Sequence, residues 1–348
     1  MASILVATFA HPSAMAAYRP PHRRKEDRVE SVASMKRTAA INVAAAPSME
    51  HIASISRSGG HAPNEDALTH YSTQESFRAF IQSKLTKLYE KYPAFQQSFR
   101  TISRDERDLF YSITDILLLF RKLREGLIAS RRTDKFSVEV YETSARLALL
   151  ITDHAQLVSS LSKLIPDLYL ASKPAHSTEN LDTDGRSLYV QIYLIYQLSY
   201  LRSPPAFLSI LRSFPSKFKQ SLEPNTLQLP LRIWSLSNSS SYRRLFSLFN
   251  SRSLSPEQTS LSDEKQIRSS NLDILIQRTL DLGLLQWREG AWAILRTAYK
   301  ECPETFIKDA LGFRTDVEIE TVREWLKARG VKEIVEGSGR WSFAGITA

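Results

Sequence analysis

The sequence has little cysteine and glycine, and each shortage excludes a class of site. One cysteine, Cys302, among 348 residues allows no internal disulfide and no zinc site built on several cysteines. The 11 glycines form no G-x-G-x-x-G or Walker pattern, and no G-x-S-x-G elbow is present. No apolar run approaches the roughly 18 residues that a membrane span needs. We expect Cys302 to be a small apolar residue at a helix end, and we expect no membrane partner.

Catalytic and metal-ligating candidates are also scarce. All seven histidines precede residue 177, and five of them lie within the first 70 residues. His154 and His176 have no partner at metal-ligand spacing, which indicates polar surface residues. Asp105, Glu106 and Asp108 follow a Thr-Ile-Ser segment and are typical of a helix N-terminus, where acids complement the dipole. The sequence therefore predicts a protein that is not an enzyme and that has no metal site and no cofactor.

The first 70 residues differ from the rest of the chain. They are rich in Ala, Ser, Pro, His and Arg and lack a sustained apolar period, which predicts a disordered tail over residues 1–70. Residues 4–10 are too short and lack the basic flank of a secretory signal. The late first acidic residue, Glu26, mildly resembles a mitochondrial presequence, and the basic residues 23–25 resemble a weak nuclear import signal.

From residue 71 onward, apolar residues recur at helical spacing. The segment 109–120 is apolar nearly all round and is expected to be buried, whereas residues 171–186 and 251–263 are expected to be loops. No fixed period joins the helices, which predicts an irregular right-handed solenoid of stacked helix pairs over residues 71–285. The expected helices cover residues 77–89, 109–120, 138–150, 156–164, 188–201, 227–237, 241–249 and 272–284, with another that begins at Ser203-Pro204-Pro205.

The last part of the chain, residues 286–348, predicts a different module. Helical patterns cover residues 291–300 and 303–311, and a third pattern ends at Gly330. Two short strands follow, 331–336 and 340–344, and a Gly-Ser-Gly turn separates them. Gly312 fits a helix C-cap, and Thr315 with Glu318 fits a capping box. Three helices and a hairpin predict a winged helix, which binds nucleic acid or protein. The expected fold class is therefore all-α, a solenoid that ends in a winged helix with a small C-terminal β-hairpin.

Two segments carry a recognisable motif. Residues 138–149 read Val-Glu-Val-Tyr-Glu-Thr-Ser-Ala-Arg-Leu-Ala-Leu, and residues 292–299 read Trp-Ala-Ile-Leu-Arg-Thr-Ala-Tyr. Both resemble helices of the GANP-type PCI family, which are scaffolds of messenger-RNA export and processing. The sequence departs from the family at Ser144, where the family has histidine, and at Thr152, where it has glycine. The positions that carry the resemblance are Tyr141, Glu142, Ala145, Arg146, Trp292 and Trp325.

The resemblance implies a non-catalytic scaffold subunit in nuclear messenger-RNA processing or export. Its expected partners are other subunits of a protein complex, a small acidic companion protein and RNA. The motif is shared in part with subunits of the proteasome lid, the signalosome and translation initiation factor three, so a structural role in one of those complexes stays open, with the cytoplasm as the alternative location. A DNA-binding regulator that uses the winged helix is the third alternative. Tyr141 and Ala145 are expected to pack, and Glu142 and Arg146 to pair on the helix surface.

Basic charge is distributed unevenly along the chain. The net charge is +9, and residues 200–285 hold 11 basic and 6 acidic residues, whereas residues 286–348 hold 10 of each. A neutral winged helix disfavours recognition of duplex DNA, which normally needs a basic surface. The candidate nucleic-acid or partner contacts are the basic residues of the third helix, the hairpin and the preceding helical region: Arg323, Lys327, Arg329, Lys332, Arg340, Arg243 and Arg244.

Overall fold

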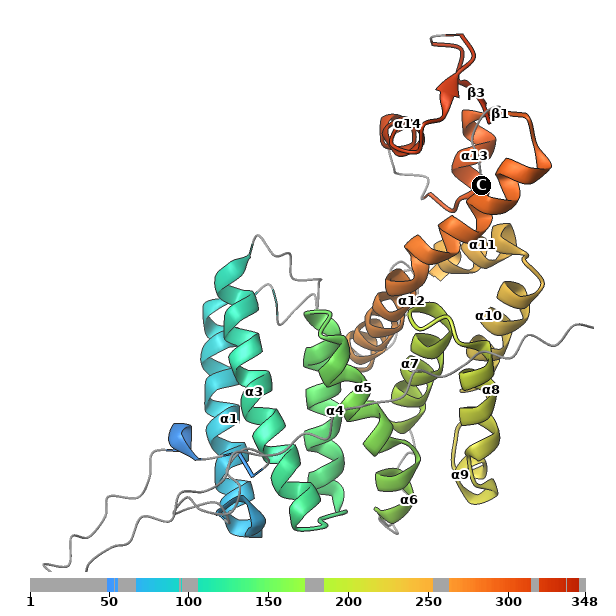
Figure 1. Cartoon of the computed structure of the whole chain (residues 1–348). Helices are drawn as coiled ribbons and strands as arrows, with labels where there is room; N and C mark the ends of the chain where they lie inside the picture. The colour runs from blue at the N-terminus through green and yellow to red at the C-terminus, as the bar shows by residue number, and fades with distance from the viewer. Residues whose placement is uncertain are drawn as a thin grey trace, which may run out of the picture. The chain divides into compact units, whose positions relative to one another are not determined.

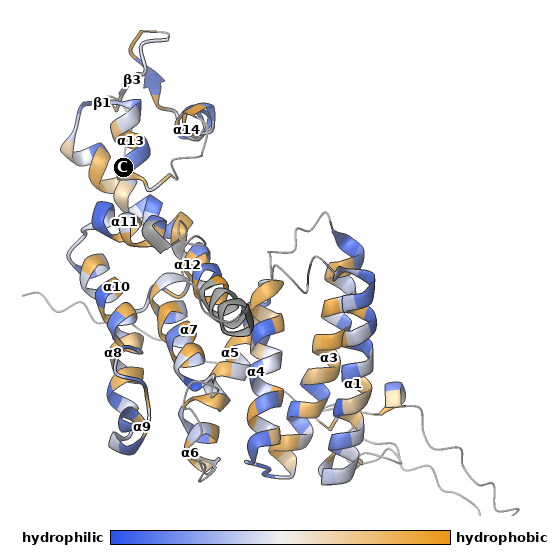
Figure 2. Cartoon of the chain, turned by 180° about the vertical axis from the view of Figure 1, so that it is seen from behind, coloured by the Kyte–Doolittle hydropathy of each residue, from blue (hydrophilic) through white to orange (hydrophobic). Residues whose placement is uncertain are grey.

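Helices make up most of the structure, as the apolar periodicity predicts (Figure 1). The computed structural model describes residues 49–52, 54–55, 67–93, 95, 106–172, 185–252, 263–313, 319–335 and 337–343. In Figure 2 most helices carry hydrophobic and hydrophilic residues on different sides, which is the arrangement of amphipathic helices. The all-α class is confirmed at this level.

The first helices form a packed series in chain order. They are α1 (Tyr71–Lys91), α3 (Arg107–Ala129), α4 (Lys135–Leu150) and α5 (His154–Lys163), and each packs against the next (Figure 1). Asp134 and Asp153 cap α4 and α5, because their carboxylates accept hydrogen bonds from backbone N–H groups three residues later. Thr152 has a φ of +56° and turns the chain into the second cap.

Part of the expected N-terminal tail belongs to this folded unit. Two short 3-10 turns, η1 (Met49–His51) and η2 (Ala67–Thr69), precede α1. Ile52 and Leu68 are buried in the core, and the Gln74 side chain donates to the Leu68 carbonyl oxygen over 2.8 Å. The prediction that the disordered tail extends to residue 70 is therefore wrong for these two turns, because their apolar side chains pack against α1 and α3. The expectation for residues 1–48 lies outside the described residues.

The middle of the chain continues with short helices. These are η3 (Leu164–Leu168), α6 (Tyr169–Ala171), α7 (Arg186–Ser199), α8 (Pro204–Ser213), α9 (Ser216–Gln220), α10 (Gln228–Asn238) and α11 (Tyr242–Arg252). Ser203 caps α8 by accepting from the Ala206 N–H, as the Ser-Pro-Pro start predicts. Most of each of the two expected loops, 171–186 and 251–263, lies outside the described residues.

One long helix, α12 (Asp263–Ala298, 36 residues), replaces the two helices predicted at 272–284 and 291–300. The segment contains no proline, and its buried residues continue at helical spacing through Leu280, Trp287, Ala291 and Leu295. The boundary expected at residue 285 thus falls inside a continuous helix.

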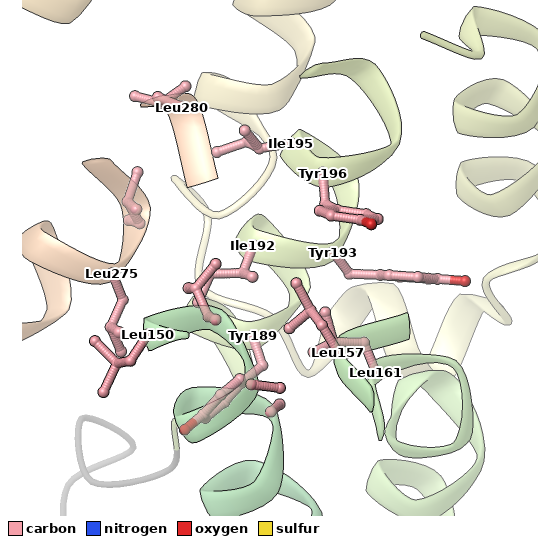
Figure 3. Packing of buried hydrophobic residues seen from close by; sticks show 14 of the residues in the cluster. Leu150, Leu157, Leu161, Tyr189, Ile192, Tyr193, Ile195, Tyr196, Leu275 and Leu280 are labelled. Atoms are coloured by element: carbon pink, nitrogen blue, oxygen red, sulfur yellow. The ribbon is translucent and has the colours of Figure 1, made fainter. Parts of the chain in front are cut away.

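The core centres on the contact between α7 and α12. Figure 3 shows Leu275 of α12 beside Leu150 of α4 and Ile192 of α7, while Leu280 lies near Ile195. A Cβ added at Gly283 would come within 2.8 Å of the Ser199 Cα, so the two helices approach closely there.

The apolar segment 109–120 is not buried all round. Within α3, Ile113 and Phe120 are fully buried, but Tyr111 and Leu118 are 61% and 47% exposed. The expectation was wrong because the described elements that pack against α3, namely α1, α4 and η2, leave Tyr111 and Leu118 uncovered.

The C-terminal region contains two helices and a small antiparallel sheet. The elements are β1 (Glu301–Pro303), α13 (Glu304–Ala310), α14 (Ile319–Lys327), β2 (Lys332–Glu333) and β3 (Arg340–Ser342), and the strand order is β1-β3-β2. The predicted hairpin is confirmed by the pairing of β2 with β3. Strand β1 was not predicted, because three residues are too few to show alternation. Gly312 has a φ of +65° after α13, as a C-cap requires, whereas Thr315 and Glu318 lie outside the described residues.

Candidate nucleic-acid and partner interface

The motif residues of α4 serve packing, as expected. Tyr141 and Ala145 are 2% and 1% exposed. The small residues of α4 let α5 approach, so that the Ser160 hydroxyl donates to the Ser144 hydroxyl over 3.2 Å. Ser144 therefore serves a close contact between α4 and α5.

Glu142, which is expected to pair with Arg146, also bonds to another helix. Both residues are half-buried, and Glu142 accepts a hydrogen bond of 2.7 Å from the Tyr169 hydroxyl. Because α6 begins at Tyr169, the bond fixes α6 to α4.

The two motif tryptophans belong to an aromatic cluster that joins the end of α12 to α14 and β3. The rings of Trp292 and Trp325 meet edge to face with centroids 5.5 Å apart. Trp292 also contacts Phe343 at 5.1 Å, and Trp325 contacts Phe313 at 6.0 Å. Edge-to-face pairs at these distances stabilise by about 0.5–1.5 kcal/mol beyond their buried area. These residues hold the C-terminal region together.

Arg323, one of the expected nucleic-acid contacts, is held by acidic neighbours. Its Nε donates to Glu304 over 2.8 Å and its Nη1 donates to Glu320 over 3.2 Å. The hydrogen bond to Glu304 raises the pKa of Arg323. Glu304 is 6% exposed and also accepts from the Trp341 indole N–H over 3.3 Å. Arg323 therefore links α14 to α13 and β3 and is not an exposed cation.

Arg329 is occupied in the same way. It forms an ion pair with Glu289 of α12, and its guanidinium carbon lies 3.4 Å from the centre of the Trp325 ring. Such a cation–π contact contributes about 0.5–2 kcal/mol. Arg329 therefore fixes the end of α14 to α12.

The other three candidate contacts of this region, Lys327, Lys332 and Arg340, are exposed. Lys327 lies at the last position of α14, and Lys332 and Arg340 lie on the outer face of the sheet, on the side opposite the buried Trp341. None of the three has an ion pair within the part of the chain that the structure describes. They remain available for an external anionic partner.

The strongest basic feature lies on α10 and α11. Arg232, Arg243 and Arg244 line an open hollow of 580 Å³, together with Leu236, Ser247 and Leu248. No acidic side chain is among these lining residues, and all three arginines are exposed. The structure therefore brings the predicted Arg243 and Arg244 together with Arg232, which was not predicted as a contact. The short turn between the helices, residues 239–241, is the sequence signal that places Arg232 near the other two.

This hollow is anchored to the C-terminal region through α11. A Cβ added at Gly312 would come within 2.6 Å of the Phe246 Cβ, so α11 and the end of α13 are in close contact. Arg288 of α12 donates to the carbonyl oxygens of Leu311 and Gly312 over 3.0 and 3.2 Å. The backbone that follows α13 is thereby held against both α11 and α12.

His154 is not the simple surface residue that the sequence suggests. Its ring stacks on Tyr200 with centroids 3.7 Å apart, and its Nδ1 lies 3.0 Å from the Tyr196 hydroxyl oxygen. Burial lowers the pKa of His154 below 6.5. It joins α5 to α7, while His176 lies outside the described residues.

The remaining expectations concern metals, membranes and Cys302. Within the described ranges, no three His, Cys, Asp or Glu side chains are grouped so that they could bind a metal ion. No described helix combines the length and apolar character that crossing a membrane requires. Cys302 is buried in β1 opposite Trp341, and burial raises the pKa of its thiol. No protein-family model matches this chain, and no curated protein matches its sequence.

Proposed function

We propose that this chain is a non-catalytic scaffold subunit of the PCI type that links protein partners to RNA in nuclear messenger-RNA processing or export. In this proposal the helices form a solenoid of helix pairs, and the C-terminal region acts as a winged helix. The observation that carries the RNA part is the hollow of Arg232, Arg243 and Arg244, which has three exposed cations and no acidic lining residue.

The charge arrangement favours RNA over duplex DNA as the nucleic acid. Two of the five candidate cations on or after α14, Arg323 and Arg329, are paired with Glu304 and Glu289 and are not free for a DNA duplex. The exposed cations instead lie on separate elements, α10, α11, the end of α14 and the sheet. Cations on separate elements can contact the phosphates of a flexible single strand, because such contacts need no fixed duplex groove. A DNA-binding regulator remains the weaker alternative.

The test is the salt dependence of RNA affinity, measured by fluorescence anisotropy with a labelled single-stranded RNA. Each phosphate contact on a single strand contributes about 0.7 to the slope of log affinity against log salt concentration. The triple variant R232E/R243E/R244E should therefore bind at least tenfold more weakly and lose about 2 from that slope.

A matched triple variant provides the control. Arg212, Lys217 and Lys219 lie on or beside α8 and α9 and are exposed, so R212E/K217E/K219E changes the net charge by the same amount. This control should keep most of the affinity. Equal losses in both variants would show that the hollow is not a binding site, and no RNA binding by the unmodified chain would end the RNA part of the proposal.

A second candidate function is structural, as a subunit of the proteasome lid, the signalosome or translation initiation factor three. The observation in its favour is β2, which forms one edge of the sheet and leads to Ile334 and Val335, 43% and 64% exposed. An exposed edge strand with apolar side chains can pair with a strand of another protein.

Purification of the tagged chain with and without nuclease distinguishes the two functions. Nuclease-resistant recovery of lid, signalosome or initiation-factor subunits would favour the second, whereas export or processing factors with a small acidic protein would favour the first.

A further inference from the structure

A second polar pocket lies on elements other than those of the basic hollow. It occupies 300 Å³ between α3, α4 and α5. Its walls are formed by four residues of α3, one of α4 and three of α5: Arg121, Arg124, Glu125, Ile128, Tyr141, Ala155, Gln156 and Ser159.

Arg124 is a buried cation that forms no direct ion pair with a described carboxylate. It is 4% exposed, and its guanidinium donates to the hydroxyls of Ser159 and Ser160 over 3.2 and 2.8 Å and to the Gln156 side-chain oxygen. All three acceptors are neutral. Within the described ranges no carboxylate forms an ion pair with it, and a buried charge without a counter-ion is unfavourable. Glu125 and Asp153 favour its charged form through space but form no ion pair with it, so the pocket keeps a positive charge in its wall.

Glu125, an acid of the same wall, is paired with another cation. It accepts a hydrogen bond of 3.0 Å from the Arg121 Nε and another from the Ser54 hydroxyl. Arg121 thus neutralises Glu125, and the pocket wall keeps one net positive charge from Arg124.

Two buried polar atoms of the same wall have no hydrogen-bond partner in the protein. They are the Arg124 Nε and the Tyr141 hydroxyl oxygen, and the Arg124 guanidinium carbon lies 5.7 Å from the centre of the Tyr141 ring. Burial raises the pKa of Tyr141 to about 12, so its hydroxyl is protonated near neutral pH and can donate a hydrogen bond. Buried polar groups in folded proteins are normally paired, and each exception calls for an explanation.

The third contribution comes from α5. Ala155 and Gln156 belong to its first turn and line the pocket. The N-terminal end of a helix carries a partial positive charge, which attracts anions. Asp153 caps this end of α5 by accepting from the Gln156 N–H, which offsets part of the helix charge, so the main positive charge at the pocket is that of Arg124.

We propose that this pocket binds the oxyanion group of a small organic molecule, either a carboxylate or a phosphate, held by Arg124 and the Tyr141 hydroxyl at the start of α5. The volume of 300 Å³ lies at the lower end of small-molecule sites, which range from about 300 to 1,000 Å³. It leaves room for more than the oxyanion itself. Ile128, 57% exposed, offers an apolar surface for the rest of the molecule.

The test is ligand binding to the full chain by calorimetry, together with the melting temperature. Phenyl phosphate and benzoate serve as probes, since they carry the two oxyanions on the same apolar group, and sodium chloride at equal ionic strength is the reference. At least one probe should raise the melting temperature above the reference. Which probe binds more tightly identifies the oxyanion. Tyr141→Phe should weaken binding roughly tenfold, which is the loss of one hydrogen bond to a charged group.

The variants are chosen so that misfolding cannot mimic the result. Tyr141→Phe removes only an unpaired hydroxyl, so its melting temperature without a probe should be unchanged or higher. Tyr193→Phe changes a buried tyrosine outside this pocket and should bind both probes as the unmodified chain does. The variant R243E/R244E, in the basic hollow, should also bind normally. The proposal is wrong if neither probe stabilises the chain beyond sodium chloride, or if Tyr141→Phe binds as tightly as the unmodified chain.

Discussion

His154 gives the folded chain a pH-dependent stability at the scale of one residue. Its pKa is lowered by burial between α5 and α7, so the folded chain takes up a proton less readily than the unfolded chain. Stability should therefore be complete above about pH 6.5 and should decrease as the pH falls through and below this value. We expect a smaller free energy of unfolding at pH 5.5 than at pH 7.5 in urea titrations. His154→Gln should reduce that difference.

The control for this prediction is another histidine. His70 is exposed beside α1 and makes no capping hydrogen bond, so His70→Gln should leave the difference between the two pH values as it is in the unmodified chain. If both variants reduce the difference equally, the stacked position of His154 does not cause it.

Single residues also show what the sequence could not predict about the candidate site. Lys327 and Arg329 are two positions apart, yet the first is exposed and the second is paired with Glu289, 40 residues earlier. Arg323 likewise meets Glu304, 19 residues earlier. The sequence predicts that a charged residue lies on a helix, but tertiary contacts determine whether that residue is paired with an acid or exposed. Arg243 and Arg244 are exposed, since the turn before α11 leaves its first residues uncovered, but their predicted role as contacts stays a prediction.

At the scale of elements, the close contact between α12 and α7 predicts opposite effects for two glycines of one helix. A Cβ at Gly283 would meet the Ser199 backbone at 2.8 Å, whereas a Cβ at Gly290 would meet only the end of the Tyr242 side chain, its hydroxyl oxygen at 2.5 Å and its Cζ at 2.8 Å. Overpacking against a backbone costs about 1–3 kcal/mol, and Gly→Ala inside a helix gains up to about 1 kcal/mol.

Gly283→Ala should therefore destabilise the chain, whereas Gly290→Ala should leave it unchanged or slightly more stable, since the end of a tyrosine side chain can move. The free energy of unfolding in urea measures both effects. A loss of stability in both variants would indicate that helix α12 has no special contact at Gly283.

The helices themselves were largely predictable from the sequence, and the exceptions have physical causes. Periodicity located α1, α4, α5, α7, α8, α10 and α11, because each buries one side against a neighbour. The apolar pattern predicted two helices where α12 is one, because half-exposed residues around Leu285 interrupt the pattern while the backbone stays helical. It missed β1, whose strand conformation depends on pairing with β3, about 40 residues later.

At the scale of the molecule, α12 connects two groups of elements. Its first half packs on α7 and α4, and its second half carries Trp287 and Trp292 toward α11 and the C-terminal sheet. Four of the five tryptophans lie at or after residue 287, so fluorescence reports on the C-terminal part, whereas circular dichroism reports on all helices. We expect both signals to show one common thermal transition.

Leu285→Pro should separate these two signals. Leu285 is 59% exposed, so the change disturbs little packing, but proline inside a helix costs about 3 kcal/mol or more and interrupts its hydrogen bonds. The fluorescence transition should then occur at a different temperature from the circular dichroism transition, whereas Leu285→Ala should keep them together. Coincident transitions in the proline variant would show that α12 does not couple the two groups.

The contact between α7 and α12 also affects how the protein is made. Helix α7 is buried on nearly all sides, yet its Ser199 hydroxyl donates to the Thr279 carbonyl oxygen, 80 residues further along the chain. At a synthesis rate of about 5–20 residues per second, this partner emerges roughly 4–16 s after α7. During that interval a strongly apolar helix is exposed to the cytosol while the ribosome is still translating. Chaperones that bind nascent chains should therefore associate with this protein mainly between the synthesis of α7 and that of α12.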